Sequence, residues 1–314
     1  MQSIANSSLS RDPLSYPGFV QKVMLVQILV GIFLYVNCLM IFTFLKKQVF
    51  REDTRYILFA QTLFVDSAFM FFTDMMLIGN YFQYRIHMIP CIFICSAIAI
   101  LSICSPLTLV AMCLERYVAI CMPLRHAEIS TSRTRFFGFI IIWGISSMPP
   151  VFFVVAHISV LPSGALFSHV ICSMEIMLQE EWQAQSRAAI LQLLFLFMSF
   201  IIVFTYIRIM IAARTASLEK KKSTNKSLRT VVLHAFQLFL CLVQFLIPYI
   251  EMTFWKVDVM VFINVRYSNF IVFIIAPRCL SPLIYGVRDE KFSLILKYYA
   301  CWGFDHSKCP LKRK

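Results

Sequence analysis

Seven long runs of apolar residues constrain this chain more than any other feature. Crossing about 30 Å of hydrocarbon takes roughly 20 helical residues, and a helix satisfies its own backbone hydrogen bonds in lipid. Seven runs reach this length, near Val23–Leu45, Tyr56–Gly79, Cys91–Ile120, Phe136–Val155, Arg187–Ile211, Leu228–Met252 and Val261–Tyr285. Because 60% of the residues are hydrophobic and only 14% are charged, little remains for a soluble domain. The sequence predicts an all-α membrane protein, a bundle of seven transmembrane helices over residues 23–285.

The two ends of the chain differ in character. Residues 1–22 are polar and lack the apolar segment of a cleavable signal peptide, so the first apolar run is expected to act as an uncleaved signal anchor. After the last run, Phe292, Ile295 and Tyr299 alternate with Lys291 and Lys297, which predicts a short amphipathic helix on the inner leaflet. Residues 286–314 are therefore expected to form a cytoplasmic helix and tail, in which Cys301 is a candidate for palmitoylation.

The basic residues indicate the orientation of the bundle. The formal net charge is +13, and most of the 29 lysines and arginines lie in or beside the first, third and fifth connections and the C-terminal tail. The positive-inside rule places these segments in the cytoplasm and the N-terminus outside. The clusters fit anionic membrane lipids and an acidic protein partner rather than nucleic acid. In this topology the Asn6 sequon can be glycosylated and the Asn225 sequon stays unmodified.

An acid and a base stand side by side at the inner end of the third run. Arg116 lies twenty-five residues after Cys91, about 37 Å along a helix, which places Glu115 and Arg116 at the cytoplasmic edge if Cys91 is at the outer edge. The residues alone leave two interpretations open. The pair is either an interfacial ion pair that reaches the headgroups or a functional charge cluster.

Further polar groups lie deep inside the runs. Asp66 is mid-run in "LFVDSAF", and Arg278 is mid-run in "APRCLSP". A buried carboxyl must pair, bind a cation or hold its proton. Three interpretations stay open: a sodium-like site, a direct pair between Asp66 and Arg278, or a protonated acid. The oxygens that could contribute to such a site belong to Asn37, Ser105 and Ser281.

Prolines and cysteines give further expectations. Pro248 and Pro282 interrupt the sixth and seventh runs, where a kink can act as a hinge or simply set the packing. Cys91 and Cys172 are the cysteines that clearly face the oxidising outside, so their pairing is expected. No catalytic motif, metal-ligand spacing or phosphate-binding loop is present, which argues against an enzyme and predicts no cofactor and no metal.

Several motifs together resemble the odorant receptors among the rhodopsin-like (class A) G protein-coupled receptors. The strings "LERYVAICMPLRHAEI" and "PRCLSPLIYGVRDEKF" are similar to the two signatures of that family, at the ends of its third and seventh helices. "LFVDSAF", "FTYIRIM" and "KSLRTVVLHA" resemble elements of its second, fifth and sixth helices. The motif "PRCLSPLIYG" is similar to the corresponding motif of fish-type odorant receptors.

The resemblance implies roles for individual residues. Arg116 would be the switch that meets a stimulatory G protein, restrained at rest by Glu115 and followed by Tyr117, and Asp66 would be the sodium-site acid. The remaining implied roles are tyrosines that move towards the switch (Tyr206, Tyr285), a hinge (Pro282), an outer disulfide (Cys91, Cys172) and an odorant pocket (Ile98, Ala99, Ser102, Ile103, Tyr249, Thr253). The implied partners are a small odorant, a G protein that raises cyclic AMP and membrane lipids.

The sequence departs from the family pattern in ways that keep alternatives open. Ser281 replaces the usual asparagine, and Arg278 is unusual in a sodium-binding receptor, where a fixed cation can replace the mobile one. A class A receptor for another small ligand remains an alternative. A channel or transporter is less favoured, because Asp66 and Arg278 alone do not make a polar path. The seventh run has no lysine to bind retinal, and no acid lies near Ile98 to bind an amine.

Overall fold

The fold is described by a computed structural model. It describes residues 19–162, 164–177, 180–216 and 259–280, together with residues 232, 236, 237, 239–244, 246, 247, 282, 292, 293 and 296. Several predicted positions lie outside the described residues: Asn6, Pro248, Tyr249, Thr253, Ser281, Tyr285 and Cys301. Most of the predicted amphipathic helix also lies outside them, although Phe292, Ser293 and Leu296 are helical.

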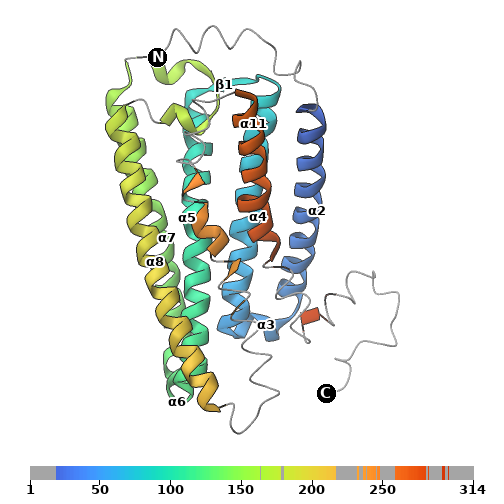
Figure 1. The fold of residues 1–314 in the computed structure, drawn as a ribbon, viewed down its shortest axis with the longest axis vertical. Helices are drawn as coiled ribbons and strands as arrows, with labels where there is room; N and C mark the ends of the chain where they lie inside the picture. The colour runs from blue at the N-terminus through green and yellow to red at the C-terminus, as the bar shows by residue number, and fades with distance from the viewer. Residues whose placement is uncertain are drawn as a thin grey trace, which may run out of the picture.

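Five long helices correspond to the first five apolar runs. They are α2 (Phe19–Lys46), α4 (Thr54–Tyr81), α5 (Met88–Cys121), α7 (Ser132–Val160) and α8 (Glu181–Ala216). All five are long and apolar enough to cross a membrane, and they run side by side along the long axis of the molecule (Figure 1). Helix α5 packs against α4, α7 and α8, so it is the central helix of this part of the bundle.

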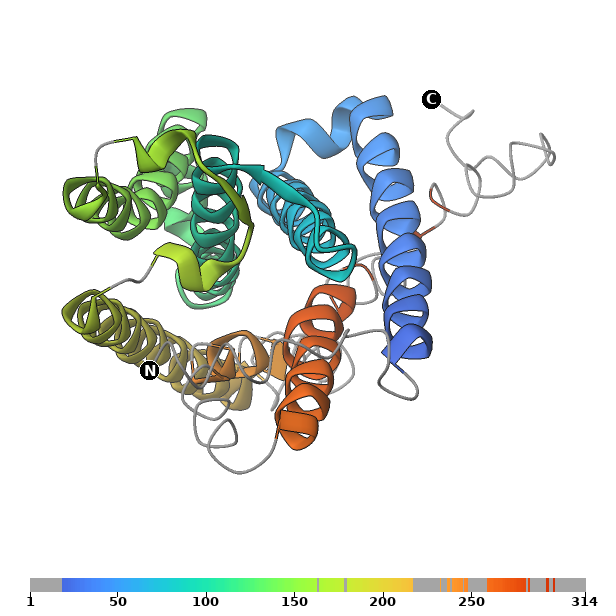
Figure 2. The same ribbon diagram turned by 90° about the horizontal axis from the view of Figure 1, so that it is seen from above.

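The sixth and seventh runs are described in part. Residues 239–243 are helical. Helix α11 (Val259–Asn269) opens the seventh run, continues as a π-helix over Phe270–Ile275 and returns to α-helix as far as residue 280. In the view from above, α11 lies beside α2 and completes a ring of helices (Figure 2). A hydrogen bond from Lys22 to Asn264 joins α2 to α11.

All five helices extend beyond the predicted apolar runs, and local capping fixes where some of them begin. The Asp53 side chain accepts a hydrogen bond from the Arg55 backbone N–H and caps α4. The Thr131 hydroxyl accepts one from the Thr134 backbone N–H and caps α7. Two short helices that the apolar pattern did not predict, α3 (Gln48–Glu52) and α6 (Pro123–Ile129), follow α2 and α5 at one end of the bundle (Figure 1).

A small β-sheet, which the apolar pattern did not predict, lies at the opposite end of the bundle (Figure 1). Strand β1 (Arg85–His87) pairs antiparallel with β2 (His169–Ile171) in the register Arg85 to Ile171. Two short 3₁₀ turns, η2 (Ala165–Phe167) and η3 (Met174–Met177), flank β2. The connection between the fourth and fifth spans is shorter than the gap between the predicted runs Phe136–Val155 and Arg187–Ile211, because α7 ends at Val160 and α8 begins at Glu181.

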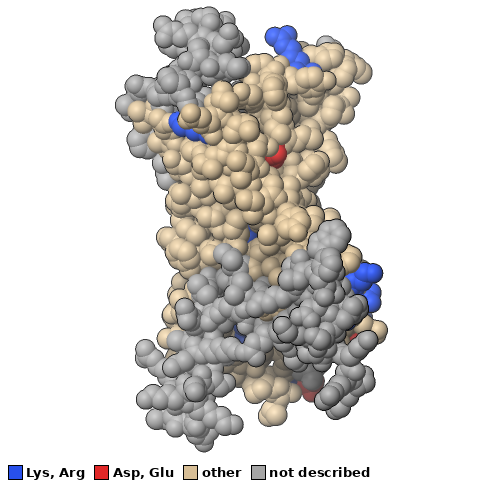
Figure 3. Space-filling model, turned by 90° about the vertical axis from the view of Figure 1, so that its right-hand side faces the viewer, with Lys and Arg blue, Asp and Glu red and all other residues tan. Residues whose placement is uncertain are grey.

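The burial pattern is that of a membrane bundle rather than a soluble protein. Phe59, Leu63 and Leu109 are fully buried between the helices. Large apolar side chains such as Ile140, Leu196 and Phe200 are more than half exposed on the outside of α7 and α8. On the face shown in Figure 3, few charged side chains interrupt the surface of the described residues. Exposed apolar side chains on this scale need lipid to cover them.

Candidate functional site

A disulfide ties the outer connection between α7 and α8 to the central helix. Cys91, in the first turn of α5, is bonded to Cys172, which follows β2, with 5.4 Å between their Cα atoms. The Asn80 side chain of α4 donates a hydrogen bond of 2.9 Å to the backbone carbonyl of Cys172. These contacts fix the segment that follows Cys172, so Ser173 and Met177 lie over the space between the helices.

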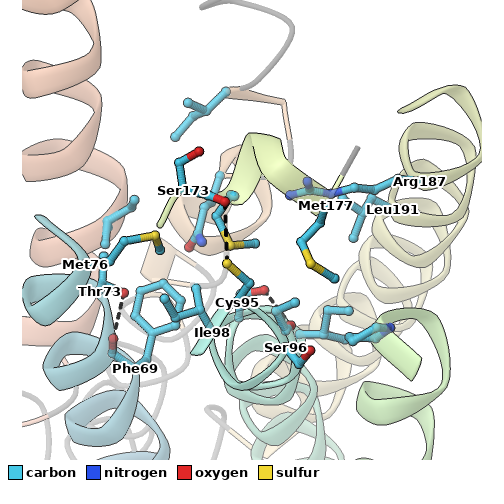
Figure 4. Close-up of a pocket in the computed structure, with 18 of the residues that line it drawn as sticks. Phe69, Thr73, Met76, Cys95, Ser96, Ile98, Ser173, Met177, Arg187 and Leu191 are labelled. Carbon is cyan, nitrogen blue, oxygen red and sulfur yellow. Dashed lines mark hydrogen bonds between the residues drawn. The ribbon is translucent and has the colours of Figure 1, made fainter. Parts of the chain in front are cut away.

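That space is a cavity of about 360 Å³ in the half of the bundle next to the β-sheet. Figure 4 shows Phe69, Thr73 and Met76 of α4 on one side of it and Arg187 and Leu191 of α8 on the other. The four pocket residues implied for the third span all line it: Ile98, Ala99, Ser102 and Ile103. Tyr249 and Thr253 lie outside the described residues.

The cavity wall is mostly apolar with a few polar groups. Phe69, Met76, Phe153 and Leu191 are among its apolar residues. The polar lining residues that the sequence reasoning missed are Thr73, Asn80, Ser96, Ser173, Arg187, Gln244, Arg266 and Asn269. An apolar cavity with a few polar groups is the usual form of a small-molecule site, in which the polar groups set orientation. The signal that could have found Gln244 is a polar amide in the middle of an apolar run.

A buried charge pair lies below the cavity. Arg278 Nε is 3.5 Å from Asp66 Oδ1, and each side chain is 1% exposed. The Ser105 hydroxyl donates a hydrogen bond of 2.7 Å to the same Asp66 oxygen. Of the three interpretations of Asp66 that the sequence left open, the structure therefore contains the direct pair with Arg278.

Two other predicted residues, Asn37 and Pro282, are also described. The Asn37 side chain donates a hydrogen bond of 3.0 Å to the Ser67 hydroxyl, which joins α2 to α4 one residue beyond Asp66. Pro282 is buried and helical. Ser67 was not recognised from the sequence, because a serine next to an acid carries no distinctive pattern.

The predicted charge cluster at the opposite end of α5 is also formed. Arg116 Nε lies 3.6 Å from Glu115 Oε2, and His126 Nε2 of α6 lies 3.6 Å from Glu115 Oε1. The next residue, Tyr117, packs against Phe204 of α8 with ring centroids 6.2 Å apart. Tyr206 of α8 is half-buried. Glu115 thus lies between the side chains of Arg116 and His126 at the junction of α5 and α6, and all three are partly exposed.

Comparison with known proteins gives the family. The family described as "7 transmembrane receptor (rhodopsin family)" matches residues 36–285, most of the chain. The chain belongs to this family. It is also 56% identical over 303 residues to "Odorant receptor 131-2" of Danio rerio, an alignment that covers 96% of this chain and 93% of the relative. Within the rhodopsin family, the chain therefore groups with the fish-type odorant receptors, as its motifs indicated.

Family membership also bears on the predicted architecture. A rhodopsin-family receptor is a bundle of seven membrane-crossing helices, which agrees with the five long helices and the two partly described ones. The predicted fold class is therefore confirmed, apart from the small β-sheet. A receptor of this family is a multi-pass membrane protein, so the exposed apolar side chains of α7 and α8 face lipid.

Proposed function

We propose that this receptor binds a small odorant in the cavity beside the disulfide-anchored segment and activates a stimulatory G protein that raises cyclic AMP. The observation that carries the proposal is the cavity itself. It lies in a rhodopsin-family bundle, has about 360 Å³ of volume and is lined mainly by apolar side chains. A similar protein of Danio rerio is called an odorant receptor. Under this proposal, the four lining residues of α5 contact the ligand: Ile98, Ala99, Ser102 and Ile103.

The proposed mechanism is a shift between a resting and an active arrangement of the helices. A ligand favours activation only if it binds the active arrangement more tightly. At rest, Glu115 holds Arg116 by the 3.6 Å contact at the inner end of α5. On activation, Arg116 leaves Glu115 and meets the G protein, while Tyr206 and Tyr285 rearrange towards it. Pro248 and Pro282 serve as the hinges.

The proposed orientation follows from the basic residues. The end of the bundle that carries α3 and α6 faces the cytoplasm of the plasma membrane, and the β-sheet faces outside. In this orientation the disulfide lies in an oxidising compartment, where such bonds persist. Residues 1–22 are extracellular with Asn6 glycosylated, residues 23–285 form the bundle and residues 286–314 are cytoplasmic.

A cyclic AMP reporter screen tests the proposed function. The receptor is expressed with the olfactory stimulatory G protein, surface expression is verified, and odorants of several chemical classes are applied. A concentration-dependent rise of cyclic AMP for at least one class is expected, with no rise in cells that lack the receptor. A receptor that reaches the surface but stays silent in basal and ligand assays would count against the proposal. Ion conductance by purified receptor in liposomes would favour a channel instead.

Removing the acid of the inner charge cluster is expected to raise basal signalling. Glu115→Gln keeps the shape of the side chain but removes the charge that restrains Arg116. A partly exposed ion pair contributes roughly 0.5–1 kcal/mol, so basal cyclic AMP should rise about two- to fivefold. Glu128→Gln on the exposed face of α6 is the matched control and should leave basal cyclic AMP unchanged. Equal basal levels in all three proteins, at equal surface expression, would argue against the restraint.

A further inference from the structure

The group at Asp66 does not fit a bound sodium ion, although the family resemblance implies one there. A sodium site needs a carboxylate whose charge is not already compensated and oxygen ligands around it. Here the Arg278 guanidinium lies 3.5 Å from Asp66 Oδ1, and both side chains are almost completely buried. A second cation beside this guanidinium would be repelled strongly, because charges so far from water are weakly screened. The cation of this site is therefore already part of the chain.

Contacts from several helices hold the guanidinium of Arg278 in place. Its Cζ lies 3.9 Å from the centroid of the Phe69 ring of α4, a cation–π contact. Its Nη1 donates hydrogen bonds to Gln244 Oε1 of the sixth span, at 3.3 Å, and to the Ile274 carbonyl, at 2.8 Å. Through Asp66, the network also includes the Ser105 hydroxyl of α5. One arginine thus connects four of the membrane-crossing segments.

Three of the groups that hold Arg278 are also walls of the cavity. Phe69, Gln244 and Ile274 all line the cavity, whereas Arg278 and Asp66 do not. Ile274 belongs to the π-helix Phe270–Ile275, which ends three residues before Arg278. Single π-helical turns inside longer helices are frequent at functional sites. A molecule that displaces the Phe69 ring or the Gln244 amide therefore changes the groups that position the buried pair.

We infer that Arg278 is a tethered cation that takes the place of a bound sodium ion and links the floor of the cavity to Asp66. The receptor is accordingly independent of sodium. The group that links the cavity to the Asp66 carboxylate is the side chain of Arg278, not a mobile ion. The link to ligand binding rests on the proposed function, whereas the tethered cation does not. Removing the arginine converts the pocket around Asp66 into a site for an external cation.

The first test compares sodium with choline at constant ionic strength. The purified full-length receptor, without ligand, is heated in about 150 mM sodium chloride or choline chloride, so that general screening is the same. The wild type should have equal midpoints in the two salts. In choline, Arg278→Gln should unfold at a lower temperature than the wild type. In sodium, the unfolding midpoint of this variant should rise by at least about 3 °C. Specific stabilisation of the wild type by sodium would overturn the inference, and so would an Arg278→Gln variant that gains nothing from it.

A double-variant cycle covers the case in which a single variant does not fold. Removing one partner of a buried pair leaves an uncompensated charge, whereas removing both is far less harmful. Asp66→Asn and Arg278→Gln should each reduce surface expression at least about fivefold, and the double variant should recover most of it. Arg133→Gln, on an exposed arginine of α7, is the matched control and should express normally. Additive losses in the double variant would contradict the pairing.

The link to the ligand has its own readout. With an agonist from the cyclic AMP screen, the half-maximal concentration should be the same in sodium and choline for the wild type and should differ at least about threefold for Arg278→Gln. Equal half-maximal concentrations for Arg278→Gln in the two salts would contradict a link between the cavity and the buried pair. If no agonist is found but the unfolding results hold, the proposed function fails and the tethered cation stands. If agonists act but sodium specifically stabilises the wild type, the proposed function stands and the tethered cation fails.

Discussion

Arg116→Ala is expected to remove at least nine-tenths of the agonist-stimulated cyclic AMP signal while leaving the receptor at the cell surface. Under the proposed mechanism, this guanidinium leaves Glu115 on activation and contacts the G protein, so alanine removes a contact made mainly in the active state. Coupling free energies between ligand and effector sites are about 1–3 kcal/mol, roughly a 5- to 150-fold change. The side chain is 23% exposed at the end of α5, so the surface expression of the variant is measured together with its signal.

The measurement is a concentration–response curve normalised to surface expression. Arg125→Ala, on an exposed arginine of α6 nine residues further along, is the matched control and should retain the wild-type maximum. Ligand binding, measured directly on membranes, should survive Arg116→Ala within about threefold, which separates loss of coupling from loss of the cavity. An unchanged maximal response in Arg116→Ala would remove this arginine from the mechanism.

Loss of the outer disulfide is expected to have a comparably large effect, through folding. The bond closes a loop with a sequence separation of 81 residues and anchors the segment that covers the cavity. Removing a native disulfide from a small domain costs roughly 2–5 kcal/mol. That is a large part of the stability of a typical protein, so Cys172→Ser should almost abolish surface expression. Cys104→Ser replaces a buried free thiol of α5 and should express at near wild-type levels.

A neighbouring thiol makes the two halves of the disulfide unequal. Cys95 Sγ lies 3.9 Å from Cys172 Sγ and 4.0 Å from Cys91 Sγ, one helical turn deeper in α5. In Cys91→Ser, oxidation can join Cys95 to Cys172, so expression should fall less than in Cys172→Ser. The double variant Cys91→Ser/Cys95→Ser should behave like Cys172→Ser. Flow cytometry of an N-terminal tag gives the measurement, and equal expression of Cys172→Ser and Cys104→Ser would contradict the structural role.

The sequence predicted the positions of the five long helices better than their ends. Hydropathy marks the part of a helix that lies in hydrocarbon, so it located the first span but not the extension of α2 back to Phe19. Helix ends depend on caps such as Asp53, which are local and polar. The strands β1 and β2 have three residues each, too few to show an alternating pattern. They form because the disulfide and the helix ends bring residues 85 and 171 together.

The functional residues were predictable to different degrees. Glu115 and Arg116 are adjacent, so the sequence alone showed them as a charge cluster, while the 3.6 Å contact between them came from the structure. Asp66 and Arg278 are separated by most of the chain, so the sequence left three interpretations, and the packing of α4 against the seventh span was needed to choose among them. Gln244 and Phe69, which hold the arginine, were not recognised, because contact between distant helices leaves no pattern in a single sequence.

The central claim is that a small molecule activates this receptor from within the cavity, and two alanines of α5 test it most directly. Ala99 lines the cavity, whereas Ala97, on the same helix, does not. Agonist concentration–response curves for Ala99→Phe and Ala97→Phe, at matched surface expression and basal cyclic AMP, are the decisive measurement. Ala99→Phe should raise the half-maximal concentration at least about tenfold by filling the ligand's space, while Ala97→Phe stays within about threefold of wild type. Equal potency of the two variants would place the ligand elsewhere and contradict activation from within the cavity.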